Sequence, residues 1–278
     1  MRWKNLRRSE NVNDQRGGGG GGLAIGGLGT IVVLVLALIL GFDPTPLLQQ
    51  QGGGPVQQAP VSPEDQERVD FVKAVLGSTE DVWIEEFAKM GKRYEPARLQ
   101  LFSGTVRSGC GFAGAQMGPF YCPADRTVYI DLSFFQELHD RFGAPGDFAQ
   151  AYVIAHEVGH HVQNLLGISG QVQQARQQAG EVEGNQLSVR LELQADFLAG
   201  MWARKGQQRF DFLEEGDLEE ALNAANRIGD DTLQRQAQGQ VVPDSFTHGS
   251  SEQRMRWFKK GLQSEQFDPN NTFQARDL

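Results

Sequence analysis

The stretch "AYVIAHEVGHHVQNLLG", residues 151–167, places three of the chain's five histidines within six positions, with a glutamate beside the first. At helical spacing, His156 and His160 stand four residues apart, so their imidazoles project from one face about one turn from each other. Two neutral imidazoles and a third protein ligand hold Zn²⁺ with one coordination position open. Glu157 would then lie beside the ion and take a proton from its bound water. The spacing predicts a zinc site with a general base.

The alternative is a buried helix in which the two histidines only satisfy their own hydrogen bonds. The flanking residues favour the metal, because they leave few polar groups to satisfy a buried histidine pair. These flanking residues are Ala151, Val153, Ile154, Ala155, Val158, Leu165 and Leu166. Gly159, which is unfavourable inside a helix, predicts that another part of the chain approaches closely there. His161 points about 100° away from the ligand face, so we expect it outside the ligand set.

A third ligand is predicted on "SVRLELQADFLAGMWA", residues 188–203, which is apolar nearly all round but contains Glu192 and Asp196. Two carboxylates four residues apart on a buried helix face are costly unless a cation compensates them. We expect Glu192 to bind the metal and Asp196 to accept the free ring N–H of a ligating histidine. In the alternative, Glu192 pairs with Arg190 or Arg204 at the surface.

The composition is that of an ordinary globular protein with an acidic charge. The 278 residues are 39% hydrophobic and 22% charged, with a net charge of −9. Residues 1–22 carry +3, which leaves −12 for residues 23–278. An acidic chain without a basic patch argues against nucleic acid as a partner.

One apolar stretch, Leu23–Gly41, contains no charged residue and is about 20 residues long, enough to span a bilayer. A cleavable signal peptide is the alternative, but the stretch is long for one and lacks a small-x-small cleavage site before Asp43. We therefore expect four segments: a basic cytoplasmic segment with a glycine run (1–22), a transmembrane helix (23–42), a Pro/Gly/Gln-rich linker (43–62) and a folded domain (63–278). The basic residues of the first segment predict that it stays in the cytoplasm.

The chain has two cysteines, Cys110 and Cys122, on either side of a glycine-rich loop. Outside the cytoplasm a disulfide would close this loop and stabilise the fold by roughly 3 kcal/mol. The alternative is a pair of unrelated buried thiols.

The patterning predicts an α+β domain with a small sheet before a helical body. Helices are expected over residues 63–76, 78–90, 147–166, 186–205, 216–227 and 250–262, and strands in 97–104 and 127–133. The second strand, "TVYIDLS", is expected to border the cleft, where an exposed edge would pair with an extended peptide.

The two motifs together resemble known families. His156-Glu157-x-x-His160, with Glu192 following 32 residues after His160 and Asp196 four residues later, resembles the gluzincin arrangement, and "ELQADFLAG" is similar to the corresponding helix of HtpX-type membrane proteases. "GPFYCPADRTVYIDLSFF", "AHEVGHHVQNLLG", "FTHGSSEQRMRWFKKG" and "MRWKNLRRSENVNDQRG" resemble the bacterial family called putative neutral zinc metallopeptidases.

The resemblance implies a zincin-like catalytic domain that hydrolyses peptide bonds. It implies one Zn²⁺ on His156, His160 and Glu192, with Glu157 as the general base and Asp196 supporting a ligand. In HtpX-type proteases a histidine followed by an arginine lies near the end of the catalytic region. His248, six residues before Arg254, occupies the similar place and is a candidate donor to the oxyanion, although glycine follows it where those relatives usually have proline.

A solvent-facing loop is the alternative for His248. Tyr121 and Tyr129 are further candidate donors to the oxyanion.

The resulting hypothesis is a membrane-anchored zinc metalloendopeptidase acting on peptides or proteins. It would cross the bacterial inner membrane once, contacting lipid through residues 23–42, with its catalytic domain periplasmic or extracellular. The alternative is an anchored zinc-stabilised scaffold without activity, against which Glu157 speaks, because a structural zinc site needs no general base. A zinc hydrolase acting on a non-peptide ester or amide would use the same chemistry.

Overall fold

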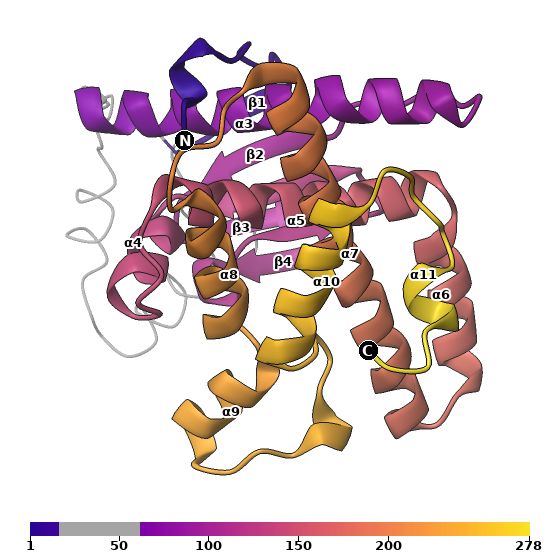
Figure 1. The fold of residues 1–278 in the computed structure, drawn as a ribbon. Coiled ribbons are helices and arrows are strands. Elements are labelled where there is room, and N and C mark those ends of the chain that lie inside the picture. Colours follow the sequence, from indigo (N-terminus) through magenta and orange to yellow (C-terminus); the bar gives the residue numbers. More distant parts are fainter. Residues whose placement is uncertain (17–61) are drawn as a thin grey trace, which may run out of the picture.

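A four-stranded sheet and a set of helices share one hydrophobic core in the computed structural model, which describes residues 1–16 and 62–278 (Figure 1). The sheet has the order β1-β2-β6-β5, and β5 is antiparallel to β6 while β1, β2 and β6 are parallel. A separate hairpin joins β3 to β4. The strands are β1 (Val12–Asp14), β2 (Arg98–Phe102), β3 (Thr105–Ser108), β4 (Gly111–Gly114), β5 (Phe120–Cys122) and β6 (Thr127–Asp131).

Helices make up most of the described chain, as the α+β prediction required. The α-helices are α3 (Pro63–Lys89), α4 (Ser133–Asp140), α5 (Asp147–Leu165), α6 (Ile168–Gln178), α7 (Glu181–Phe210), α8 (Asp217–Arg227), α9 (Asp230–Gln238), α10 (Ser251–Gln263) and α11 (Asn271–Gln274). The 3₁₀ turns are η1 (Trp3–Asn5), η2 (Ala115–Met117) and η3 (Pro243–Ser245).

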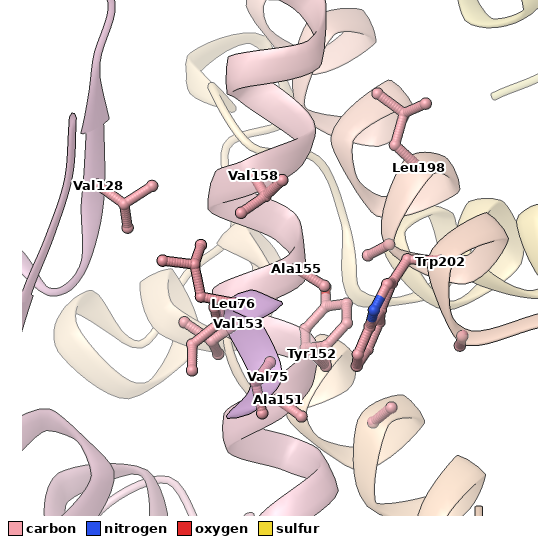
Figure 2. Close-up of a cluster of buried hydrophobic side chains, with 14 of the residues drawn as sticks. Val75, Leu76, Val128, Ala151, Tyr152, Val153, Ala155, Val158, Leu198 and Trp202 are labelled. Atoms are coloured by element: carbon pink, nitrogen blue, oxygen red, sulfur yellow. The ribbon is translucent and has the colours of Figure 1, made fainter. Parts of the chain in front are cut away.

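Helix α5 is the centre of the core. Figure 2 shows its apolar side chains Tyr152 and Val158 between Val128 of β6 and Trp202 of α7, with Leu76 of α3 nearby. All five of these side chains are buried. The apolar run around the paired histidines is therefore a core helix, and its rigidity fixes the polar side chains that it carries.

Helix α3 is one continuous helix where two were expected. The Ser62 hydroxyl caps it by accepting from the Asp65 amide at 3.0 Å, and Pro63 occupies its first turn. The expected break at Gly77 is wrong for a steric reason. A Cβ at Gly77 would lie 2.5 Å from the carbonyl oxygen of Arg7, so the glycine admits another segment instead of ending the helix.

That other segment is the amino-terminal one. Three donors from it converge on the buried carboxylate of Glu80 in α3: Arg7 at 2.7 Å, the Ser9 hydroxyl at 2.5 Å and the Asn11 amide at 2.7 Å. Strand β1 then pairs with β2 in the main sheet, with Val12 opposite Leu99. Residues 1–16 are thus part of the same folded body as residues 62–278.

Pairing of β1 with β2 puts residues 12–14 in the same sheet as residues 98–102. The basic residues from which a cytoplasmic segment was predicted also make ion pairs within the fold. Most of them form ion pairs on the domain or within the segment: Arg2 with Asp211, Lys4 with Glu67, Arg7 with Glu80 and Asp81, and Arg16 with Asp14.

The expected transmembrane helix (23–42) and nearly all of the linker (43–62) lie outside the described residues. Among the helices that the structure does describe, none combines the length and the apolar character needed to cross a membrane.

Candidate metal centre

The two predicted motifs meet where α5 lies against α7. His156 Nε2 is 3.2 Å and His160 Nε2 is 3.4 Å from the same oxygen, Oε2 of Glu192. One donor atom from each residue falls within 4.8 Å of the other two. The helices approach this closely because of Gly159, where a Cβ would lie 3.1 Å from the backbone of Ala195. The close approach predicted from Gly159 is confirmed.

The other ring nitrogens make the donor set suitable for a metal. His156 Nδ1 is 2.8 Å from Asp196 Oδ1, and His160 Nδ1 is 2.9 Å from Gln163 Oε1. An acceptor at each Nδ1 assigns the ring proton to that nitrogen and leaves the Nε2 lone pair facing Glu192. His156, His160 and Glu192 therefore fit Zn²⁺, which prefers two or three imidazoles and a carboxylate with one position open.

The local charge also suits a divalent cation. The carboxylates of Glu157, Glu192 and Asp196 face one buried cation, Arg254, so with neutral histidines the cluster carries two uncompensated negative charges. Burial alone lowers the pKa of His156, but the charge of Asp196 and its hydrogen bond outweigh burial and raise that pKa to about 10. In the metal-free protein, His156 therefore holds a proton whose positive charge compensates the nearby carboxylates. A bound metal ion would supply positive charge at the same position.

Asp196 is the hub of a buried network, in the supporting position that the sequence predicted. It is fully buried and accepts from His156 Nδ1, from the Tyr152 hydroxyl at 2.5 Å, and from Arg254 Nε and Nη2 at 2.9 and 3.0 Å. Burial opposes its ionisation, but the charge of Arg254 outweighs burial and lowers the pKa of Asp196 to about 2. Asp196 therefore stays charged and fixes the orientation of the His156 ring.

Sequence reasoning gave Arg254 no role here, although a signal was present. Arg254 is 3% exposed, and it lies in the buried stripe of α10, which consists of Ser251, Arg254, Trp257, Phe258 and Gly261. An arginine at a core position of an amphipathic helix indicates a buried carboxylate partner. Helix α10 reaches Asp196 because Gly200 of α7 and Gly261 let the two helix backbones touch.

Glu157 lies beside the ligands, one residue after His156, and is 8% exposed. Burial is the largest influence on it and raises the pKa of its carboxyl group, with the two histidines opposing this rise. A raised pKa suits a group that must take a proton and release it again.

His248 lies on the loop before α10 and lines the same cavity as the candidate ligands. Its side chain is 53% exposed and its Nδ1 is 3.2 Å from Asp230 Oδ1. The hydrogen bond with Asp230 raises the pKa of His248 despite partial burial. Asp230 was missed by sequence reasoning, yet its Oδ2 accepts the backbone amides of Thr247, His248 and Gly249 at 2.7, 2.6 and 3.0 Å. This one carboxylate fixes the loop that carries His248.

A cavity of about 750 Å³ contains the whole centre. Its lining includes His156, Glu157, His160, Glu192, His248 and Arg254. The expected strand "TVYIDLS" does not border the cavity, because β6 is an inner strand and is buried along its length. The strand at the cavity is β5, the edge of the sheet, whose Phe120 and Tyr121 line it.

Two other residues singled out from the sequence lie elsewhere or are already bonded. Tyr129 is buried and its hydroxyl donates to Asp125 at 2.7 Å, away from the cavity lining. His161 is also outside the ligand set, as predicted, because its Nδ1 faces the Tyr121 hydroxyl at 3.0 Å and its Nε2 faces the Glu95 carbonyl at 2.7 Å.

Comparison with known proteins agrees with this geometry. The sequence profile of the family described as "Putative neutral zinc metallopeptidase" matches residues 1–273. The chain belongs to this family. The uncharacterized protein YpfJ of Escherichia coli strain K12 is 51% identical to this chain over 284 residues, covering 98% of this chain and 99% of its own length.

The uncharacterized proteins Rv2575 of Mycobacterium tuberculosis strain H37Rv and Mb2605 of Mycobacterium bovis are each 42% identical over 264 residues, covering 87% of this chain and 86% of their own lengths. No solved structure matches the chain. Membership in a zinc metallopeptidase family that includes residues 1–16 agrees with their place in the folded body.

The two cysteines of this family member form the disulfide Cys110–Cys122. The bond ties the β3–β4 hairpin to β5, the strand at the cavity. It therefore limits the movement of the loop that includes η2 on one wall of the cavity.

Proposed function

We propose that the protein is a zinc-dependent metalloendopeptidase with a zincin-like centre, in which His156, His160 and Glu192 hold the ion and Glu157 is the general base. The observation that carries this proposal is the convergence of three ligand side chains and one buried carboxylate on a single open cavity. A structural zinc site would be closed by a fourth protein ligand and would need no cavity of this size.

Zn²⁺ bound here would lower the pKa of a coordinated water and polarise the scissile carbonyl. Glu157 takes the proton of the attacking water as the C–O bond forms, and delivers it to the departing nitrogen as the C–N bond breaks. Asp196 and Gln163 hold the two imidazoles in the correct tautomer.

His248 would stabilise the negative oxygen that develops on the carbonyl carbon. Its raised pKa keeps the imidazole protonated to a higher pH, and a cationic donor stabilises an oxyanion better than a neutral one. Asp230 sets its position through both the side chain and the loop backbone. The glycine at position 249, where a proline usually occurs in HtpX-type proteases, leaves an N–H that donates to Asp230.

Strand β5 would bind the substrate backbone. It pairs with β6 on one side only and lies at the cavity with Phe120 and Tyr121. An extended peptide added along its other edge would pass over the ligand residues, in the manner of β-strand addition.

The test is Glu157→Gln in the zinc-loaded full chain, with Glu183→Gln on the exposed start of α7 as the matched control. We expect Glu157→Gln to retain about one zinc per chain and to lower the rate of peptide hydrolysis by a factor of at least about 100. Glu183→Gln should keep both zinc and rate. Equal hydrolysis by both variants would remove Glu157 from the mechanism, and retained zinc with no hydrolysis by the wild type would favour the zinc-stabilised scaffold.

We propose further that residues 1–16 and the domain lie in one compartment, outside the cytoplasm. Pairing of β1 with β2 supports a shared compartment, and the disulfide supports an oxidising one. Glu10→Cys and Arg276→Cys, at exposed positions, can be labelled in intact cells with a membrane-impermeant maleimide. Labelling of both variants supports the proposal. Labelling of Arg276→Cys alone would instead support a chain that crosses the membrane once, with its amino terminus in the cytoplasm.

A further inference from the structure

We infer that the enzyme cleaves peptides on the amino side of a bulky apolar residue, whose side chain enters the apolar part of the cavity. This inference rests on the proposed function and adds the substrate class to it. Besides the polar groups of the metal centre, and besides Met117, Pro119 and Phe120 on and before β5, the cavity is lined by Phe134, Phe142, Val153, Ile228 and Leu233. These five side chains come from α4, the loop after it, α5, the end of α8 and α9.

The apolar part lies on one side of the metal ligands. Val153 precedes His156 by three residues and Glu157 by four, so it lies on the same face of α5 one turn nearer the helix start. Ile228 lies near this turn of α5, because one side chain connects them. Arg254 donates both to the Ile228 carbonyl and to the hydroxyl of Tyr152 on α5. Figure 1 shows α4 and α8 on the same side of the molecule, along the first half of α5.

The chemistry of the reaction decides which substrate residue this part receives. Glu157 must reach the departing nitrogen to protonate it, so the residue that supplies this nitrogen lies on the Glu157 side of the scissile bond. Of the five apolar residues, Val153 is the nearest to Glu157 along the chain, one turn before it on α5. The side chain of the residue after the scissile bond therefore enters the space lined by Val153 and the four other apolar residues.

The walls select for size and against charge. The charged side chains at this end, Glu137 and Arg141, are 3.8 Å apart and compensate each other, and the Arg141 guanidinium stacks 5.1 Å from the Phe142 ring. The Tyr121 hydroxyl is already bonded to His161 and to Asn164. Leucine, phenylalanine, isoleucine and methionine would bury hydrocarbon here, whereas aspartate or lysine would lose hydration without a partner.

The first experiment measures cleavage sites in a mixture of synthetic 14-residue peptides, using the zinc-loaded full chain and mass spectrometry. We expect kcat/KM to be at least about 10-fold higher with leucine or phenylalanine after the scissile bond than with alanine or aspartate. Leu233→Arg should abolish this preference and favour acidic residues at the same position. Gln238→Arg, which adds the same charge at an exposed position of α9 outside the cavity, should keep the wild-type preference.

The second experiment measures the pocket without turnover, by calorimetric binding of the hydroxamates of leucine and glycine to zinc-loaded Glu157→Gln. At least about 10-fold tighter binding of the leucine compound is expected. Tighter binding without cleavage of any peptide by the wild type would retain the pocket and overturn the proposed function. Cleavage with no preference after the scissile bond, or with a preference only before it, would overturn the inference and retain the function.

Discussion

Replacing Asp196 by asparagine tests the network that connects folding to metal binding. The substitution keeps the size of the side chain but removes the charge that faces Arg254, at two positions that are 0% and 3% exposed. An unpaired guanidinium left in such a site costs about 3–5 kcal/mol. The pKa of Asp196 gives a second estimate of the free energy that this charge contributes to folding. A fall from 3.8 to about 2 corresponds to about 2–3 kcal/mol in the metal-free protein, at roughly 1.4 kcal/mol per pKa unit.

Because the folded pKa of Asp196 is below the unfolded one, its contribution is present above pH 3.8 and is lost as the pH falls towards 2. Urea denaturation at neutral pH should therefore show Asp196→Asn to be less stable by about 2–5 kcal/mol. Zinc affinity, measured by competition with a chelating dye, should weaken by about 10–100-fold, because His156 loses the acceptor that orients it.

The matched control is the double variant Asp196→Asn/Arg254→Met, which removes both charges. We expect it to be more stable than the sum of the two single changes by about 2–3 kcal/mol. A loss of stability below about 1 kcal/mol for Asp196→Asn, together with unchanged zinc affinity, would refute the assignment of Asp196 as the hub.

The other predictions concern the ligand set, the loop of His248, the helix crossing and the disulfide. Glu192→Ala should lower bound zinc from about one per chain to a small fraction, measured by atomic emission after dialysis. Asp230→Asn should remove an ion pair with His248 that is worth less than about 1 kcal/mol because His248 is half exposed. That pair stabilises the fold between the two pKa values. It is lost as the pH falls through the lowered pKa of Asp230, below 3.8, or rises through the raised pKa of His248, above 6.5. The difference in stability between variant and wild type should therefore be smaller above the pKa of His248 than at neutral pH, and what remains there comes from the backbone amides that Asp230 accepts. Gly159→Val should cost about 1–3 kcal/mol by pushing α7 away from α5, whereas an unchanged melting temperature would contradict the close approach. Cys110→Ser should lower stability by roughly 3 kcal/mol under oxidising conditions and have no effect relative to the reduced wild type.

The helical part of the fold was predictable because its signals are local. Periodicity gave α5, α8 and α10 within about two residues, and it gave the middle of α7, whose polar first turns carry little periodicity. Gly77 shows the limit of such reasoning. A glycine inside a helical pattern indicates either that the helix ends there or that another segment packs closely against it. At Gly77 only the contact with the Arg7 backbone distinguishes the two. Strand β1 has three residues and is recognisable only by its partner β2.

The cluster of candidate metal ligands was predictable for a similar reason. Histidines and carboxylates at helical spacing in apolar surroundings have few alternative roles, so His156, His160 and Glu192 could be assigned before their contact was known. Asp230 could not, because its partners are backbone amides of residues 247–249, and nothing in the sequence around position 230 specifies them.

The pairing of β1 with β2 also sets the order of events during synthesis. Strand β1 ends at Asp14, but its partner begins only at Arg98, and β6, which holds β2 on the other side, ends at Asp131. At about 5–20 residues per second, about 6–23 s pass between the synthesis of β1 and the completion of its docking site. During that time the first segment has no partner, and if it is carried to the wrong compartment β2 is left with an open edge that invites aggregation. The main sheet can therefore be completed with β1 only after Asp131 has been synthesised.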